Sequence, residues 1–340
     1  MGDFNREAWN GLCHEAERIG ASDIHVTAGQ PSFLRVDGAL RRCDGPCPEN
    51  LFLHGLLEEM VSEEQIKRFL EEKELDFAWS FGERRLRINA FYQRGSLAFA
   101  CRLVPKTIPT LEEIGAPVVF NKLLSKRNGL ILVCGPTGSG KTTTLSSFVN
   151  TINRTRAEHI LTLEDPVEFL HVSDKSLVQQ RAYGEDFFSF AGALKSALRE
   201  NPDILLVGEL RDADAVATAL HAAETGVLVL ASLHTHTAAE AVLRLVSFFP
   251  AEQQEEIRMQ LSLVLEAVIT QQLVPAKDGG RVAASEVLAA TPAVRSMIRS
   301  GKVQQFASVM MAGAEYGMQT MGQAMEALAK QGKIAQETFL

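Results

Sequence analysis

A glycine-rich segment near the middle of the chain has the composition and spacing of a phosphate-binding loop. The apolar run 130–134 precedes it, and residues 143–150 are typical of a helix start. In such a strand–loop–helix context, glycines let successive backbone N–H groups surround a phosphate, and the helix N-terminus adds partial positive charge. A chance glycine-rich turn is the alternative, and these flanks disfavour it. The residues expected to bind the nucleotide are Gly135, Pro136, Thr137, Gly138, Ser139, Gly140, Lys141, Thr142 and Thr143.

The last residues of this loop have the side chains that nucleotide chemistry needs. Lys141 can reach the β- and γ-phosphates of ATP, and the Thr142 hydroxyl can hold Mg²⁺. ATP and Mg²⁺ are therefore the expected cofactors.

Acidic residues follow two further apolar runs. Glu209 comes after residues 204–207, and Glu164 comes after residues 159–163 and before Pro166. The carboxyl ends of parallel strands face the ligand crevice of such sheets. We expect Glu209 to act as general base on the attacking water, with a solvated carboxylate as the alternative. Glu164 is the expected second Mg²⁺ ligand and a further catalytic candidate.

A histidine follows the apolar run 227–231. His234 next to a γ-phosphate could sense charge or donate a hydrogen bond, and a purely structural role is an equal alternative from the residues alone. His236 is a weaker candidate. A metal site at the two histidines is not expected, because no third ligand accompanies them.

The rest of the chain predicts the elements that position these residues. Its length of 340 residues, with 46 % hydrophobic and 22 % charged residues, suits two globular domains. We expect an N-terminal α+β domain over residues 1–104, a proline-rich linker over 105–117 and an α/β domain over 118–340. In the last of these, alternating strands and helices predict a mainly parallel sheet covered by helices on both faces.

Individual elements follow from periodicity and capping residues. In the N-terminal part, predicted helices cover 4–19, 49–60 and 63–72, and Ser62 and Gln65 have the spacing of a capping box at the start of the last one. Predicted strands cover 22–26, 75–81, 86–90 and 97–103, and a hairpin is expected to turn at Asp37-Gly38. Asp186, Asp212 and Thr237 are expected helix N-caps, and Thr237 and Glu240 form a second capping box pattern. Near the C-terminus we expect a long helix over 252–272, a strand over 281–288 and helices over 292–299 and 318–330.

Composition also restricts the function class. The net charge of −8 argues against general nucleic-acid binding. No apolar run has the roughly 18 residues of a membrane span, and the charged start does not resemble a signal peptide, so a cytoplasmic protein without direct membrane insertion is expected. The five cysteines are scattered, and Cys43 and Cys47 are expected to be free thiols rather than zinc ligands.

Several of these segments together resemble the secretion/type IV pilus ATPase superfamily. Segments 162–168, 201–212 and 233–235 look like its Asp, Walker B and His boxes, and 22–25 and 85–91 resemble its PAS-like N-terminal domain. Segment 316–321 resembles the C-terminal helices of retraction motors of the PilT type. The resemblance implies a RecA-like ATPase domain, a homohexameric ring and ATP-driven pilus retraction with twitching motility. It also implies attachment at the inner membrane through a pilus platform protein.

The resemblance changes the interpretation of three arginines. From alternation with Leu86 and Ile88 alone, Arg85 and Arg87 suggest a solvated strand face. In the family, nucleotide lies between subunits, so Arg85, Arg87 and Arg102 become candidates to reach the phosphates of a neighbouring subunit.

Two departures from the retraction group keep alternatives open. Val227 stands where that group has a second histidine, and 293–298 differs at three positions from the family's Ala-Ile-Arg-Asn-Leu-Ile motif. The alternatives are an accessory or non-catalytic paralogue of the pilus motor, or another secretion-system ATPase. A nucleic-acid motor on the same core is a further alternative that the charge disfavours.

Overall fold

The structure is a computed structural model that describes residues 5–36, 38–82, 84–104 and 106–335. It divides into two compact units, one of Met1–Thr107 with Pro166–Leu170 and one of Ile108–Asp165 with His171–Leu340. Asp37 of the predicted hairpin turn lies outside the described residues.

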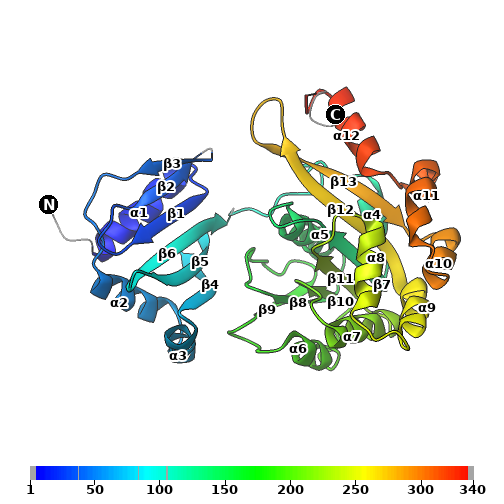
Figure 1. Ribbon diagram of the computed structural model, residues 1–340, viewed down its shortest axis with the longest axis horizontal. Helices are drawn as coiled ribbons and strands as arrows, with labels where there is room; N and C mark the ends of the chain where they lie inside the picture. Colours follow the sequence, from blue (N-terminus) through cyan, green and yellow to red (C-terminus); the bar gives the residue numbers. More distant parts are fainter. Residues whose placement is uncertain (1–4, 37, 83, 105, 336–340) are drawn as a thin grey trace. The chain divides into compact units, whose positions relative to one another are not determined.

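The first unit is an antiparallel sheet with helices (Figure 1), in the strand order β3-β2-β1-β6-β5-β4. Its elements are α1 (Arg6–Arg18), β1 (Asp23–Thr27), β2 (Phe33–Val36), β3 (Ala39–Arg42), α2 (Asn50–Met60), α3 (Glu63–Glu72), β4 (Glu74–Phe81), β5 (Arg84–Gln93) and β6 (Ser96–Val104). Trp9 of α1 is fully buried and meets Phe99 of β6 edge-on, with ring centroids 6.4 Å apart. The capping box of Ser62 and Gln65 is confirmed. This sheet matches the predicted α+β character of the N-terminal part.

The second unit is a seven-stranded sheet in the order β13-β12-β7-β11-β10-β8-β9. Only the pairing of β12 with β13 is antiparallel, so the predicted mainly parallel α/β sheet is confirmed. Its strands are β7 (Gly129–Cys134), β8 (His159–Glu164), β9 (Leu177–Ala182), β10 (Ile204–Val207), β11 (Leu228–Leu233), β12 (Leu265–Pro275) and β13 (Arg281–Ala289). Its helices are α4 (Val119–Leu124), α5 (Lys141–Thr155), α6 (Phe190–Ala197), α7 (Ala213–Glu224), α8 (Ala238–Ser247), α9 (Gln254–Val264), α10 (Pro292–Arg299), α11 (Phe306–Ala312) and α12 (Met321–Lys330), with short 3₁₀ turns at Val303–Gln305 and Ala314–Tyr316.

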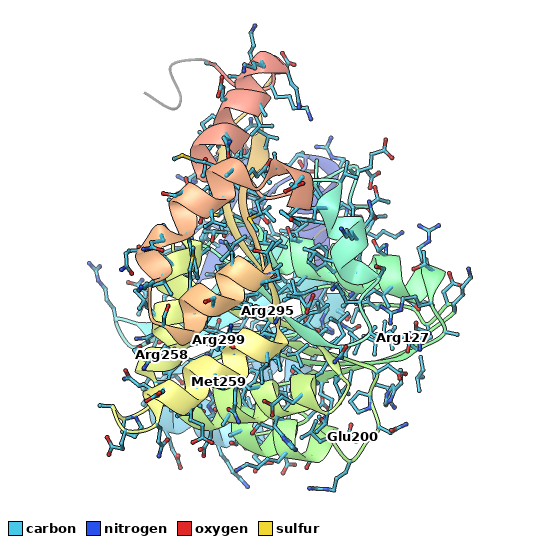
Figure 2. The ribbon with its side chains drawn as sticks, turned by 90° about the vertical axis from the view of Figure 1, so that its right-hand side faces the viewer. Arg127, Glu200, Arg258, Met259, Arg295 and Arg299 are labelled. Atoms are coloured by element: carbon cyan, nitrogen blue, oxygen red, sulfur yellow. The ribbon has the colours of Figure 1, made fainter. Side chains whose placement is uncertain are left out.

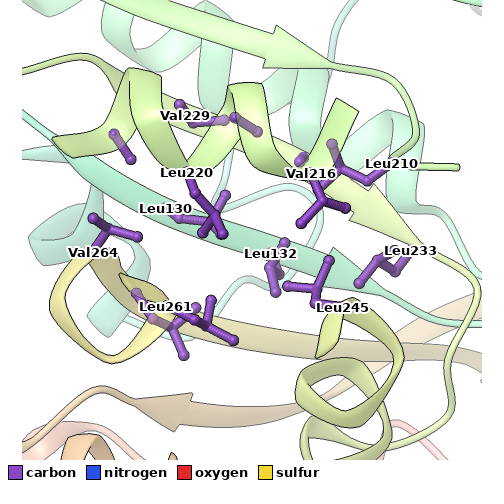
Figure 3. Close-up of a cluster of buried hydrophobic side chains, with 14 of the residues drawn as sticks. Leu130, Leu132, Leu210, Val216, Leu220, Val229, Leu233, Leu245, Leu261 and Val264 are labelled. Atoms are coloured by element: carbon purple, nitrogen blue, oxygen red, sulfur yellow. The ribbon is translucent and has the colours of Figure 1, made fainter. Parts of the chain in front are cut away.

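Both faces of this sheet are buried. Leu130 and Leu132 of β7 belong to one apolar cluster (Figure 3), and Ile131 and Val133 belong to another. Successive side chains of a strand point to opposite faces, so helices cover the sheet on both sides. The carboxyl ends of β7, β8, β10 and β11 therefore meet at one sheet edge, where the predicted site residues follow. Within the described residues, no helix combines the length and apolarity needed to cross a membrane.

The predicted long helix over 252–272 is wrong. The chain forms α9 and then turns at Leu265 into β12, which pairs with β7 on one side and β13 on the other. Residues 267–270 are all completely buried, as expected of a strand covered on both faces, whereas a surface helix would bury a single stripe. The apolar run alone did not distinguish the two.

An arginine from α10 holds the end of α9. Figure 2 shows Arg295 and Arg299 on α10 beside the helix that carries Arg258 and Met259. The Arg295 guanidinium donates to the carbonyls of Ser262 and Leu263 at 2.8 and 2.7 Å, which satisfies carbonyls that a helix end leaves free. Arg295 belongs to the segment 293–298 that departs from the family motif, and it has this structural role.

Two of the predicted caps need correction. Asp212 and Thr237 cap α7 and α8 as predicted, but the N-cap of α6 is Ser189 and not Asp186. Asp186 instead accepts the N–H of Ala182 at 2.8 Å and closes a turn. In the second predicted capping box, Glu240 accepts from the N–H of His236 at 2.8 Å, one residue before the expected donor. The last helix begins at Met321 rather than 318, because Thr320 caps it.

Candidate nucleotide-binding site

The glycine-rich loop connects β7 to α5 and has the backbone that a phosphate cradle requires. Gly135, Gly138 and Gly140 have φ values of 144°, 79° and 88°, in the region that favours glycine. A Cβ on Gly140 would lie 2.8 Å from Nε2 of Gln271, so a larger residue cannot occupy this position without displacement. The loop ends at Lys141, the first residue of α5, and Thr142 and Thr143 follow in its first turn.

Lys141 directs its ammonium into this loop. Its Nζ donates to the carbonyls of Gly135 at 2.8 Å and Pro136 at 3.0 Å, and it lies 3.4 Å from Nδ1 of His234. Burial lowers the pKa of Lys141. The structure thus brings two predicted site residues, from β7–α5 and from the end of β11, into direct contact.

Glu209 lies in a chain of charged groups beyond the end of β10. Its Oε1 is 3.6 Å from Nε2 of His234, and its Oε2 accepts from Nε of Arg211 at 2.8 Å. Arg211 also pairs with Asp165 at 3.1 Å, where β8 has just ended. Lys141, His234 and Glu209 are therefore brought together, and Arg211 joins them without having been predicted.

The contacts of His234 define its protonation. Burial first, and the charge of Lys141 second, lower the pKa of this imidazole, against the opposing effect of Glu209. An ammonium can only donate, so Nδ1 accepts from Lys141 and the ring proton is on Nε2, facing Glu209. A neutral His234 is thus a link between the phosphate-binding lysine and the carboxylate.

Glu164 is buried and held by two donors. Its Oε1 accepts from the Thr162 hydroxyl at 2.7 Å and from Nε2 of Gln180 at 3.0 Å. A carboxylate and the Thr142 hydroxyl are oxygen donors of the kind that Mg²⁺ prefers. Among the described residues, no three His, Cys, Asp or Glu side chains are grouped as a cation site. The metal roles of Thr142 and Glu164, like the free-thiol assignment of Cys43 and Cys47, stay predictions.

Gln271 is a loop-supporting residue that sequence analysis missed. From the buried middle of β12, its Nε2 donates to the carbonyl of Ser139 at 2.9 Å, and its Oε1 accepts from the Thr144 hydroxyl at 2.7 Å. It therefore ties the phosphate loop to the first turns of α5. The wrong assignment of β12 as helix concealed it, since a helix would not have placed this side chain beside the loop.

Replacing Gln271 should weaken nucleotide binding. A Gln271→Ala variant leaves the buried Ser139 carbonyl without its donor, at a cost of about 1–3 kcal/mol, which corresponds to an affinity loss of about 5- to 150-fold. Titration with a fluorescent ATP analogue measures the change in Kd. Gln272→Ala, at the next and less buried position of β12, is the matched control and should retain affinity. Equal affinities of the two variants would contradict the assigned role.

The three candidate arginines have partners within the first unit. Arg87 pairs with Glu168 at 3.1 Å, and Arg102 lies 3.2 Å from Asp23. Arg85 donates to the Ser80 hydroxyl at 3.0 Å and to the carbonyl of Val167 at 3.3 Å. Of the two arginines that form ion pairs, Arg102 is the more exposed: 65 % of its side-chain surface is exposed, against 36 % for Arg87. Their action on a neighbouring subunit's nucleotide stays a prediction.

The position of the missing family histidine lies away from this edge of the sheet. Val227 immediately precedes β11 at its amino end, whereas His234 follows its carboxyl end. Val227 is 9 % exposed and packs in the main apolar cluster. A strand advances about 3.3 Å per residue, so a histidine at this position would lie about 23 Å from His234 along the strand.

The partly buried His171 predicts acid sensitivity. Burial lowers the pKa of His171 to about 4. An unfolded histidine titrates near 6.5, so this stabilising contribution is complete above that pH and is lost as the pH falls toward 4. At pH 5 the loss in the free energy of unfolding should be about 2 kcal/mol, seen in urea unfolding at pH 7.5 and 5. His171→Phe should remove that loss, and His221→Gln, at an exposed position of α7, should not; an undiminished acid effect in His171→Phe would refute the assignment.

Comparison with known proteins gives consistent matches over nearly the whole chain. The profile of the family described as type II/IV secretion system protein matches residues 6–335. The chain is 45 % identical, over 94 % of its length and 93 % of the relative, to the "Type IV pilus retractation ATPase PilT" of Pseudomonas aeruginosa. It is 46 % identical to the "Twitching motility protein" of Neisseria gonorrhoeae over 94 % of this chain and 87 % of that protein. A crystal structure of the pilus retraction motor PilT with bound ADP superposes with a TM-score of 0.89 at 44 % identity, covering 97 % of this chain and 95 % of that one.

Proposed function

The chain belongs to the type II/IV secretion system protein family, and we propose that it works as a hexameric, Mg²⁺-dependent motor that retracts type IV pili. It is an ATPase homologue of pilus retraction proteins over most of its length. The observation that most supports the proposal is the contact of Lys141 with His234, and of His234 with Glu209, at the carboxyl edge of the sheet. A purely regulatory nucleotide-binding protein would not need a carboxylate at that place.

The proposed chemistry assigns one role to each side chain. The loop amides and Lys141 hold the β- and γ-phosphates of ATP, and Thr142 with Glu164 would hold Mg²⁺, which would neutralise charge on the phosphates. Glu209 takes the proton of the attacking water with Oε1, because Arg211 holds Oε2 and fixes the orientation of the carboxylate. His234, neutral with its proton on Nε2, responds when the phosphate draws Lys141 away from the loop carbonyls.

Motion would follow from the loss of these contacts after hydrolysis, when rigid parts of a subunit can shift against each other. We propose a closed homohexamer in the cytoplasm in which Arg85, Arg87 and Arg102 serve a neighbouring subunit. A platform protein of the pilus at the inner membrane would be the partner that receives the motion. An accessory paralogue of the motor is the main alternative, favoured by the changes at Val227 and 293–298.

A deletion in the source organism tests the proposed function. Loss of a retraction motor should leave excess surface pili and abolish twitching, and the intact gene, but not one encoding Glu209→Gln, should restore both. Unchanged pilus number and twitching would favour the accessory alternative. Phosphate release from purified protein separates an enzyme from a regulator that works by occupancy, and stimulation by DNA would favour a nucleic-acid motor.

A further inference from the structure

A buried carboxylate of β13 lies at the N-termini of two helices. Glu286 is 7 % exposed, and its Oε1 accepts the N–H of Ala238, the first residue of α8, at 2.9 Å. The N–H of Met321, the first residue of α12, also donates to it. The first N–H groups of a helix have no partner within the helix, so this single side chain satisfies one from each. Glu286 has no place in the chemistry described above.

The first of these helices is joined to the site by a short segment. The chain runs from His234 through the buried Thr235 to Thr237, the N-cap of α8. The N–H of His236 in this segment is bound by Glu240 of α8. The segment that carries His234 is thus fixed at one end by β11 and at the other by the start of α8. A displacement of that start would move His234 relative to Lys141 and Glu209.

The second helix is docked on β13 around the same residue. Gln319 exchanges both backbone hydrogen bonds with Val287, at 2.8 and 3.1 Å, and its side chain donates to the carbonyl of Ser285 at 2.7 Å. These contacts flank Glu286 on both sides along the strand. Figure 1 shows β13 running from the region of α12 into the sheet. The start of α12 is therefore held by the strand that also holds the start of α8.

A carboxylate suits this junction better than its amide. Helix N-termini carry partial positive charge, and hydrogen bonds to an ionised acceptor are about twice as strong as neutral ones. Glutamine has the same shape but carries no charge and has a single accepting oxygen, so it binds the two N–H groups less strongly. Glu286→Gln therefore weakens one connection while keeping the packing of the side chain.

We propose that Glu286 is a positioning residue for ATP hydrolysis, which ties the segment carrying His234 to the docked C-terminal helix α12. The inference rests on the proposed function, since it concerns the rate of the same site. Coupling of this kind is reciprocal in binding free energy, so a partner that pulls on α12 would also affect the state of the His234 segment. The C-terminal helix α12 is then part of the machinery that sets turnover.

Kinetics of three variants of the full chain test this. Relative to wild type, Glu286→Gln should lower kcat about tenfold and Gln319→Ala about threefold, with Kd for a fluorescent ATP analogue within about twofold. The double variant should be no slower than Glu286→Gln, because both changes break one connection. Gln323→Ala, which alters the capping box of α12 without contacting β13, is the control and should keep wild-type kcat.

The outcomes are distinguishable. Wild-type kcat in Glu286→Gln, or multiplication of the two single effects in the double variant, overturns the inference. A parallel loss in Gln323→Ala also overturns it, because general loosening of α12 would then explain the data. Gln319 is only partly buried, so its variant keeps the test valid if Glu286→Gln folds poorly. Absence of hydrolysis by the wild-type protein would instead refute the proposed function.

Discussion

Glu209→Gln should bind ATP with normal affinity and hydrolyse it at least about 10²-fold more slowly, because a carboxamide cannot take the proton of the attacking water. Lys141→Ala should lose both binding and hydrolysis, since the phosphates lose the charge that the loop directs at them. Phosphate release measures the first property and titration with a fluorescent nucleotide the second. The contrast between the two variants separates a role in chemistry from a role in binding.

The structure supplies a control for the Glu209 variant. Arg211 pairs with both Glu209 and Asp165, so Glu209→Gln also removes one charge partner of this arginine. Asp165→Asn removes the other partner and leaves Glu209 intact. If Asp165→Asn is as slow as Glu209→Gln, freeing Arg211 explains the loss; if Glu209→Gln turns over near the wild-type rate, the base is Glu164.

The parts of the site that could be predicted from the sequence are local in the chain. The phosphate loop has a fixed spacing between a strand and a helix, and Glu209 follows a short apolar strand after a single glycine. The alternation of such strands with helices also predicted the parallel sheet, which is confirmed. Periodicity placed Leu86 and Ile88 inside and Arg85 and Arg87 on the other face, and the burial agrees.

The parts that could not be predicted depend on residues far apart in sequence. Whether residues 265–272 form helix or strand is decided by pairing with β7 and β13, and no local signal in that apolar run contains this information. Gln271 could not be placed beside the loop without this strand. Arg211 was visible as a neighbour of Glu209, but its second partner, Asp165, comes from the end of another strand.

Arg87→Ala and Glu209→Gln should each be inactive alone and should recover partial activity when mixed. The physical reason is that, in the proposed homohexamer, a nucleotide at a repeated, head-to-tail interface would draw on two subunits, and an arginine supplied in trans can be worth about 10³–10⁵ in rate. In a mixed ring, some interfaces combine an intact Arg87 with an intact Glu209, which neither homomeric variant has. Phosphate release is measured after dissociation and reassembly, so that subunits exchange.

The pairing of Arg87 with Glu168 provides the control that makes this test specific. The two side chains form an ion pair at 3.1 Å. A loss of activity in Arg87→Ala therefore has a second explanation, which is that the variant leaves Glu168 without its ion-pair partner. Glu168→Gln removes the same pair and keeps the arginine, and it should retain activity if Arg87 serves the phosphates. Should mixed rings form without recovery, Arg87 acts within its own subunit or one inactive interface stalls the ring. Mixing wild-type subunits with Glu209→Gln subunits decides between these. A ring that one inactive site stalls loses activity more steeply than the fraction of inactive subunits, whereas rings whose sites work independently lose it in proportion, which leaves Arg87 acting within its own subunit.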